Sequence, residues 1–133
     1  MNELKTLQII NELCKVKLEK TIDKHCSYDA ENSNHIAEIK NRRTYYSTKM
    51  IEASKLFINY QKAQLKSKTF IYVVTDPKGV YIFNITKLID DILKQEIVKN
   101  IQPSTTDFKN SKKIIKFYYN LKEEMSSFTF VFN

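Results

Sequence analysis

The chain has 133 residues, a length typical of one domain, and 42% of them are hydrophobic, which suffices to bury a core. Lys and Arg number 22 against 15 Asp and Glu, and the net charge of +7 favours an anionic partner, either nucleic acid or an acidic membrane surface. No apolar run is long enough to span a membrane, polar residues interrupt the start of the chain, and the two cysteines form no disulfide framework, so we expect a cytoplasmic protein with reduced thiols.

The first expected element is a helix over residues 3–20. Apolar residues recur there at spacings of three and four, as on one face of a helix: Leu4, Leu7, Ile10, Leu13 and Cys14. Glu3 falls within this apolar arc, where a carboxylate needs a reason. It is either a functional carboxylate or a terminal residue favoured by the helix dipole.

A β-hairpin is expected next, because residues 22–30 and 35–42 alternate between apolar and polar side chains. A turn centred on Ser33 and Asn34 pairs each residue of the first arm with the residue of the second arm that lies equally far from the turn. A symmetric four-residue loop over residues 32–35 gives the same pairing. The register of the hairpin is therefore predicted whichever loop forms.

This register places Asp29 directly opposite Glu38. Side chains in such positions have Cβ atoms about 4.5–5.5 Å apart, and two carboxylates at that distance repel unless a cation neutralises them. Lys40 lies on the same face of the strand as Glu38 and adds a positive charge beside the pair. The alternative is a plain surface hairpin with solvated charges.

Residues 47–66 are expected to form a second helix, with Ser47 or Thr48 as its cap. Residues 69–75 are a nearly continuous run of apolar and β-branched residues, which is typical of a strand buried on both faces. A turn that contains a proline and a glycine follows, and residues 80–85 return as a strand.

The C-terminal third continues with elements of both kinds. We expect a helix over residues 86–99, a loop over 100–111, a basic and aromatic strand over 112–119, a short helical turn near Glu123, and an apolar strand over 127–132. The whole chain is thus predicted to be a single α/β domain, residues 1–133, with a mixed sheet of about five strands and helices on both sides.

Asp29, followed by Glu38-Ile39-Lys40, resembles the PD-(D/E)XK signature of restriction-endonuclease-like nucleases. Tyr28 stands where that signature has a proline. The core of these nucleases runs helix, strand, Asp-bearing strand, Glu-x-Lys strand, helix, strand, and the elements expected over residues 3–85 follow this order.

The resemblance implies a nuclease that hydrolyses phosphodiester bonds of DNA with Mg²⁺ or Mn²⁺. Asp29, Glu38 and the backbone carbonyl of Ile39 would bind the metal, and Glu3 from the first helix would assist. Lys40 would orient the attacking water or stabilise the charge that develops on the phosphate.

Cations that follow the signature suggest how DNA would be held. Arg42, Arg43 and Lys49 are expected to contact phosphates on either side of the scissile one. Cutting both strands of a duplex would favour a homodimer, because one domain presents one site. The alternative is a nuclease-like fold that binds nucleic acid or a partner protein without cutting.

Overall fold

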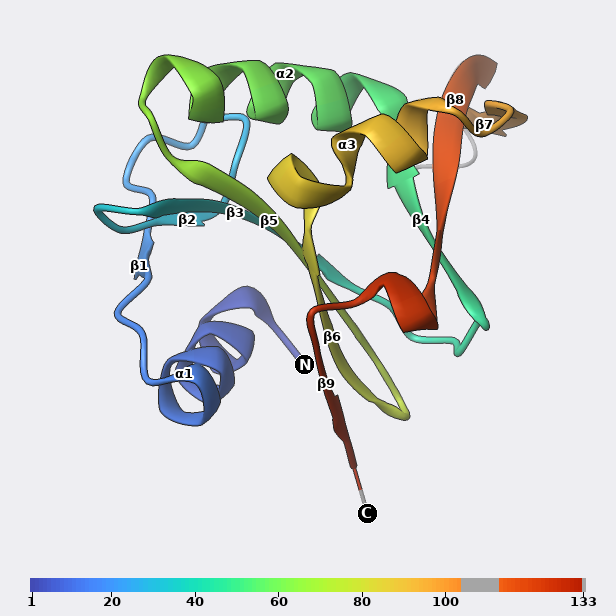
Figure 1. The fold of residues 1–133 in the computed structure, drawn as a ribbon. Coiled ribbons are helices and arrows are strands. Elements are labelled where there is room, and N and C mark those ends of the chain that lie inside the picture. Colours follow the sequence, from blue (N-terminus) through green and yellow to red (C-terminus); the bar gives the residue numbers. More distant parts are fainter. Residues whose placement is uncertain (104–112, 133) are drawn as a thin grey trace.

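The computed structural model describes residues 1–103 and 113–132, and in these residues most strands belong to one mixed sheet (Figure 1). The strand order is β1-β2-β3-β5-β6-β9. The bounds are Glu19–Lys20 for β1, Ala30–Glu31 for β2, His35–Asn41 for β3, Thr69–Asp76 for β5, Gly79–Asn84 for β6 and Phe128–Val131 for β9. Only β3 and β5 pair in parallel among these neighbours; the other pairs are antiparallel.

A second, smaller antiparallel sheet has the strand order β4-β8-β7. Its strands are β4 (Thr48–Glu52), β8 (Lys113–Lys122) and β7 (Val98–Pro103). The mixed α/β fold predicted from the sequence is confirmed, but the main sheet has six strands in the described residues rather than about five. The second sheet was not predicted.

Helices cover both faces of the main sheet, as expected (Figure 1). Helix α1 (Glu3–Cys14) packs on one face, and α2 (Ala53–Leu65) and α3 (Ile85–Leu93) pack on the other. Alternation along β3 divides the core, because Ile36 joins the cluster that contains α2 while Ile39 joins the cluster that contains α1. No helix in the described part of the chain is long and apolar enough to cross a membrane.

Helix α1 ends six residues before the predicted end at residue 20. The chain turns at Lys15, whose φ of 53° lies in the left-handed region that commonly ends a helix. The side chain of Asn11 then bonds both the N–H and the C=O of Leu18 at 3.0 Å, which holds the returning chain against the helix. This return leads into β1.

The prediction of one helix over residues 47–66 was wrong in its first third. Residues 48–52 form β4, and α2 begins after Glu52, which is its N-cap in place of Ser47 or Thr48. The strand forms because Ile51 pairs with Tyr119 of β8 and is fully buried in the core. Pairing with a distant strand outweighed the local helical pattern.

The β5–turn–β6 hairpin forms where the sequence predicted it. Asp76 stabilises the turn, because its Oδ1 accepts the N–H groups of Lys78 and Gly79 at 2.8 and 3.0 Å. Strand β9 lies so close that a Cβ at Gly79 would stand 2.2 Å from the carbonyl oxygen of Phe130. The predicted C-terminal strand therefore completes the main sheet beside a position that only glycine can occupy without displacement.

The remaining C-terminal elements differ from the prediction mainly in their bounds. Helix α3 ends at Leu93, and residues expected in the loop at 100–111 belong in part to β7, the rest lying outside the described residues. The predicted basic and aromatic strand extends to Lys122 as β8. The helical turn expected near Glu123 is confirmed as a 3₁₀ turn, η1 (Glu123–Met125).

Candidate active site

The hairpin of β2 and β3 has the predicted register, but the prediction of a first arm over residues 22–30 was wrong, because the strand there is only Ala30–Glu31. Ala30 pairs with Ala37 and Glu31 with Ile36, and the N–H of Asn32 donates to the carbonyl of His35 at 3.0 Å across the turn. The turn is therefore the two-residue one. This register brings the end of the first arm, where Asp29 lies, beside the centre of β3.

The regular ladder between the two arms stops at Asp29. Its N–H donates to the carbonyl of Ala37 at 2.8 Å, and its carboxylate Oδ2 accepts the N–H of Ile39 at 2.7 Å. The side chain of Asp29 thus replaces a backbone carbonyl of the first arm. Because the N–H and C=O of one strand residue point to the same edge, the Ile39 carbonyl also faces the side where Asp29 lies.

The carboxylate of Glu38 is largely buried, and one of its oxygens lacks a hydrogen bond. Its side chain is 13% exposed, and its Oε2 is the one buried side-chain nitrogen or oxygen in the described residues without a hydrogen-bond partner. Lys55 lies 4.0 Å from the other oxygen, Oε1. Burial first, and then the charge of Asp29, raise the pKa of Glu38 from its ordinary 4.5 to about 7.

A narrow cleft of about 160 Å³ opens at Glu38, between the main sheet, the start of α2 and the second sheet. Its cations are Lys40, Arg42, Lys55 and Lys116, its carboxylates are Glu38 and Glu52, and Met50, Ile51, Tyr72 and Tyr118 complete its lining. Lys116 and Glu52 face each other at 3.9 Å. The cleft therefore combines one buried carboxylate with an excess of positive charge, which suits an anion held beside a cation site.

Lys40 reaches this cleft from the same face of β3 as Glu38. The residue as a whole is exposed, but partial desolvation and the neighbouring Arg42 lower the pKa of its ammonium group, and Glu38 opposes this change. The predicted association of Glu38 with Lys40 is present.

Glu3 lies in the first turn of α1 and pairs with Lys20 at 3.7 Å, with both side chains largely exposed. It does not line the cleft at Glu38. Its charge nevertheless contributes to the raised pKa of Glu38, so the two groups interact electrostatically. The structure supports a peripheral position for Glu3.

The three cations predicted to hold phosphates have different environments. Arg42 lines the cleft, and Arg43 is exposed just beyond it. Lys49 was wrongly placed at the surface: its side chain is 3% exposed and its Nζ lies 2.8 Å from Asp76 Oδ2 and 3.2 Å from Glu123 Oε1. These carboxylates neutralise the ammonium group inside the protein, so Lys49 is not available to DNA.

Two cleft cations were not identified as site residues from the sequence. Lys55 lies on α2 and Lys116 on β8. Lys55 enters the cleft because β4 shifts the start of α2, and Lys116 enters because β8 pairs with β4. No local pattern reveals this pairing.

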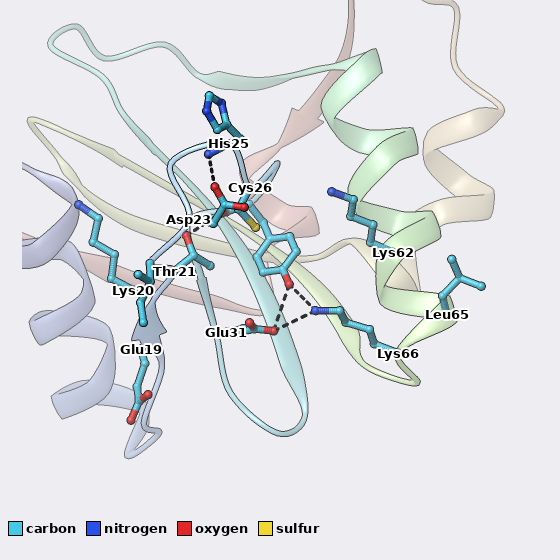
Figure 2. Close-up of a pocket in the computed structure, with 12 residues that line it drawn as sticks. Glu19, Lys20, Thr21, Asp23, His25, Cys26, Glu31, Lys62, Leu65 and Lys66 are labelled. Carbon is cyan, nitrogen blue, oxygen red and sulfur yellow. Dashed lines mark hydrogen bonds and ion pairs between the residues drawn. The ribbon is translucent and has the colours of Figure 1, made fainter.

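A larger hollow, with a volume of about 590 Å³, is lined by the chain around β1, the hairpin and the end of α2. Figure 2 shows the residues that line it. At its centre, Glu31 lies 3.4 Å from Lys66, and the Tyr28 hydroxyl contacts both of these side chains at 3.1 and 2.6 Å. Lys62 donates to Ser27 at 2.8 Å. No residue that lines this hollow has a buried carboxylate oxygen without a hydrogen-bond partner, which is what distinguishes Glu38 in the cleft.

Within residues 1–103 and 113–132, no group of three or more His, Cys, Asp or Glu side chains gathers as a metal site. Asp29 and Ile39 do not line the cleft, but Asp29 is close enough to Glu38 for its charge to contribute to the raised pKa of Glu38. Comparison of the chain with protein-family models and with curated proteins gave no match.

Proposed function

We propose that the chain is a divalent-metal-dependent nuclease that hydrolyses phosphodiester bonds of DNA, with its site at Glu38. The observation that carries the proposal is the buried Oε2 of Glu38, which has no hydrogen-bond partner beside a second carboxylate. Buried polar atoms are rarely left unsatisfied unless they have a role in binding or catalysis. A cation between Glu38 and Asp29 would satisfy this atom, offset the burial of the charge, which is the main cause of the raised pKa, and remove the repulsion by Asp29, which is the second.

The order of elements also supports the proposal. Helix α1, strands β1, β2 and β3, helix α2 and strand β5 follow one another as in the nucleases whose signature the sequence resembles, with β4 inserted before α2. Strand β5 lies parallel to β3 after the helical crossover. Glu38 and Lys40 lie on β3, as a Glu-x-Lys strand would have them, whereas Asp29 lies one residue before β2 and not on the strand itself.

The donor set fits Mg²⁺ or Mn²⁺, which prefer oxygen ligands. Asp29, Glu38 and the carbonyl of Ile39 would hold the ion, and the N–H of Ile39 fixes one carboxylate oxygen of Asp29 in position. When bound, such an ion polarises the phosphate and lowers the pKa of the attacking water.

The cations of the cleft complete the site. Lys40 lies next to Glu38 on the same face and would donate hydrogen bonds to the negative charge that develops in the transition state. Lys55 and Lys116 would hold the phosphate oxygens from the opposite walls. In this arrangement the carboxylates would bind the metal, and the lysines would bind the phosphate.

Two measurements test the proposal. Calorimetry with Mn²⁺ should detect binding to the wild type and loss of binding in Glu38→Gln, which keeps the size of the side chain. Incubation with plasmid, single-stranded and branched DNA in Mg²⁺, Mn²⁺ or EDTA should show cutting that depends on the metal. A wild type that binds no metal and cuts none of these substrates would refute the nuclease.

A second candidate is a module on the same fold that binds nucleic acid without cutting. The observation that favours it is the small donor set, because two carboxylates fall short of a three-residue metal cluster in the described residues. DNA affinity that is equal in EDTA and Ca²⁺, and equal in wild type and Glu38→Gln, would favour this module.

A further inference from the structure

A second cavity, of about 130 Å³, adjoins the cleft and shares Arg42 and Met50 with it. Its remaining walls include Thr44, Tyr46 and Val74. Lys49 and Asp76 also line it, but most of the surface that the lining exposes to the cavity is apolar. The two cavities therefore differ in character, the first being cationic and the second mostly apolar.

The two cavities follow one another along a single face of β3 and β5. Glu38 pairs with Tyr72 and Lys40 with Val74, and the N–H of Arg42 continues the pairing to the carbonyl of Thr75. Side chains two residues apart on a strand are about 6.6 Å apart and share a face. A bound chain that passes Glu38 and Lys40 would thus reach the second cavity at Arg42.

Tyr46 is presented at this cavity with its side chain open to solvent. The residue is 62% exposed, while its backbone carbonyl accepts a hydrogen bond from the buried ammonium of Lys49. Lys49 and Asp76 neutralise each other beneath the cavity. The backbone of Tyr46 is therefore anchored, its ring is accessible, and Arg42 supplies the positive charge at the junction of the two cavities.

We propose that the second cavity is a nucleobase subsite, and that the substrate enters as a single strand whose base stacks on Tyr46 while an adjacent phosphate lies in the cationic cleft. This inference rests on the proposed function and adds the substrate class. Grooves that bind single strands combine cations along the backbone with aromatic rings for the bases. In a duplex the faces of the bases are stacked on one another and cannot reach Tyr46.

The walls of the cleft support entry of one strand. Residues of β4 and β8, among them Lys116 and Tyr118, face β3 and β5 across a volume of about 160 Å³. Glu38 lies in this recess with 13% of its side chain exposed. The flexible backbone of a single strand can bend into such a recess. A duplex cannot do so without also moving its paired second strand toward the cleft walls.

The test compares wild type, Tyr46→Ala, Tyr46→Leu and Tyr46→Phe by fluorescence anisotropy, with single-stranded and duplex oligonucleotides of equal length in Ca²⁺. Stacking contributes about 1–3 kcal/mol per base, so single-strand affinity should fall roughly 5- to 150-fold in Tyr46→Ala and in Tyr46→Leu. Tyr46→Phe keeps the ring and should bind as the wild type does. Duplex affinity should not change in any variant.

An unchanged single-strand affinity in Tyr46→Ala, or an equal loss on duplex, would overturn the subsite. Circular dichroism and thermal melting establish that each variant is folded, and the exposed position of Tyr46 makes folding of at least the leucine variant expected. Repeating the titrations in EDTA separates the two proposals. If the wild type binds no metal but Tyr46→Ala still loses single-strand affinity, the nuclease fails and the subsite stands.

Discussion

Asp29 accepts a hydrogen bond from the backbone N–H of Ile39 at 2.7 Å, so the strand that carries Glu38 also orients the second carboxylate. The two groups are coupled through the register of one hairpin. A slip by one residue would move Glu38 and Lys40 together to the opposite face of the sheet, away from the cleft. The site therefore depends on a hairpin whose turn is two residues long.

The stability of the protein should depend on pH through Glu38. Its pKa is about 7 in the folded chain and near 4.5 when exposed, so the folded state binds more protons between these values. The contribution of this group to stability is present below about pH 4.5 and is lost as pH rises through 7. Glu38→Gln should therefore raise the free energy of unfolding at pH 8 by roughly 2–3 kcal/mol and leave it nearly unchanged at pH 4.

Urea denaturation at the two pH values measures this effect in the absence of divalent metal. Glu96→Gln is the matched control, because Glu96 is exposed and the same substitution there should have little effect at either pH. An equal change at pH 4 and pH 8 in Glu38→Gln would show that the substitution acts through packing and not through the charge.

Two substitutions should separate catalysis from metal binding. Lys40→Ala leaves both carboxylates in place, so Mn²⁺ should still bind, while loss of one transition-state donor should lower the cutting rate about 10²- to 10³-fold. Asp29→Asn keeps an oxygen that can accept the N–H of Ile39 but removes the charge, so metal affinity and cutting should fall together. Calorimetry and single-turnover cleavage measure the two quantities. Loss of Mn²⁺ binding in Lys40→Ala would contradict the roles assigned here.

DNA affinity should fall with salt to an extent that depends on Arg42 and Arg43. Each phosphate contact contributes about −0.9 to the slope of log affinity against log salt for a duplex, and about −0.7 for a single strand. The double variant Arg42→Ala and Arg43→Ala should make the slope shallower for every sequence tested. Lys94→Ala, at an exposed position after α3, is the control. An unchanged slope in the folded double variant would remove these arginines from the interface.

Lys49 should matter for stability and not for DNA. Lys49→Met leaves the carboxylate of Asp76, whose side chain is 1% exposed, without its partner. Removing one member of a buried ion pair typically costs about 3–5 kcal/mol, and urea denaturation at pH 7 should show a loss of this size. Lys20→Met breaks a surface pair and should cost at most about 1 kcal/mol. Full stability of Lys49→Met would mean that methionine packs as well as the ion pair.

The two hairpin turns and their registers, which depend on neighbours in sequence, were predicted correctly, although the end of the first helix and the first arm over residues 22–30 were not. Alternation along β3 and the short turn at Ser33 and Asn34 determine the hairpin register, and these features are local. The β5–β6 hairpin was likewise evident from its apolar strands and from the turn that begins at Asp76. Glu38 and Lys40 were placed together because a strand places alternate residues on one face.

The errors that affect the cleft arose where distant segments meet. Met50 and Ile51 have helical spacing with later residues, yet they lie in β4 because β8 pairs with it. The position of Lys49 depends on Asp76 and Glu123, which are 27 and 74 positions away along the chain. No pattern within the length of one helix or strand contains this information. The side of the cleft that β4 and β8 form was therefore not predicted.

The pairing of β4 with β8 also sets the order in which the site can assemble. Strand β4 lies in the first half of the sequence. Its partner, β8, is synthesised only after β5, β6, α3 and β7. Contacts between such distant segments slow folding, because a long loop must close before they form. A nascent chain can therefore build the hairpin of Asp29 and Glu38 well before Lys116 and Tyr118 wall the cleft. Full substrate recognition would consequently be among the last properties that a growing chain acquires.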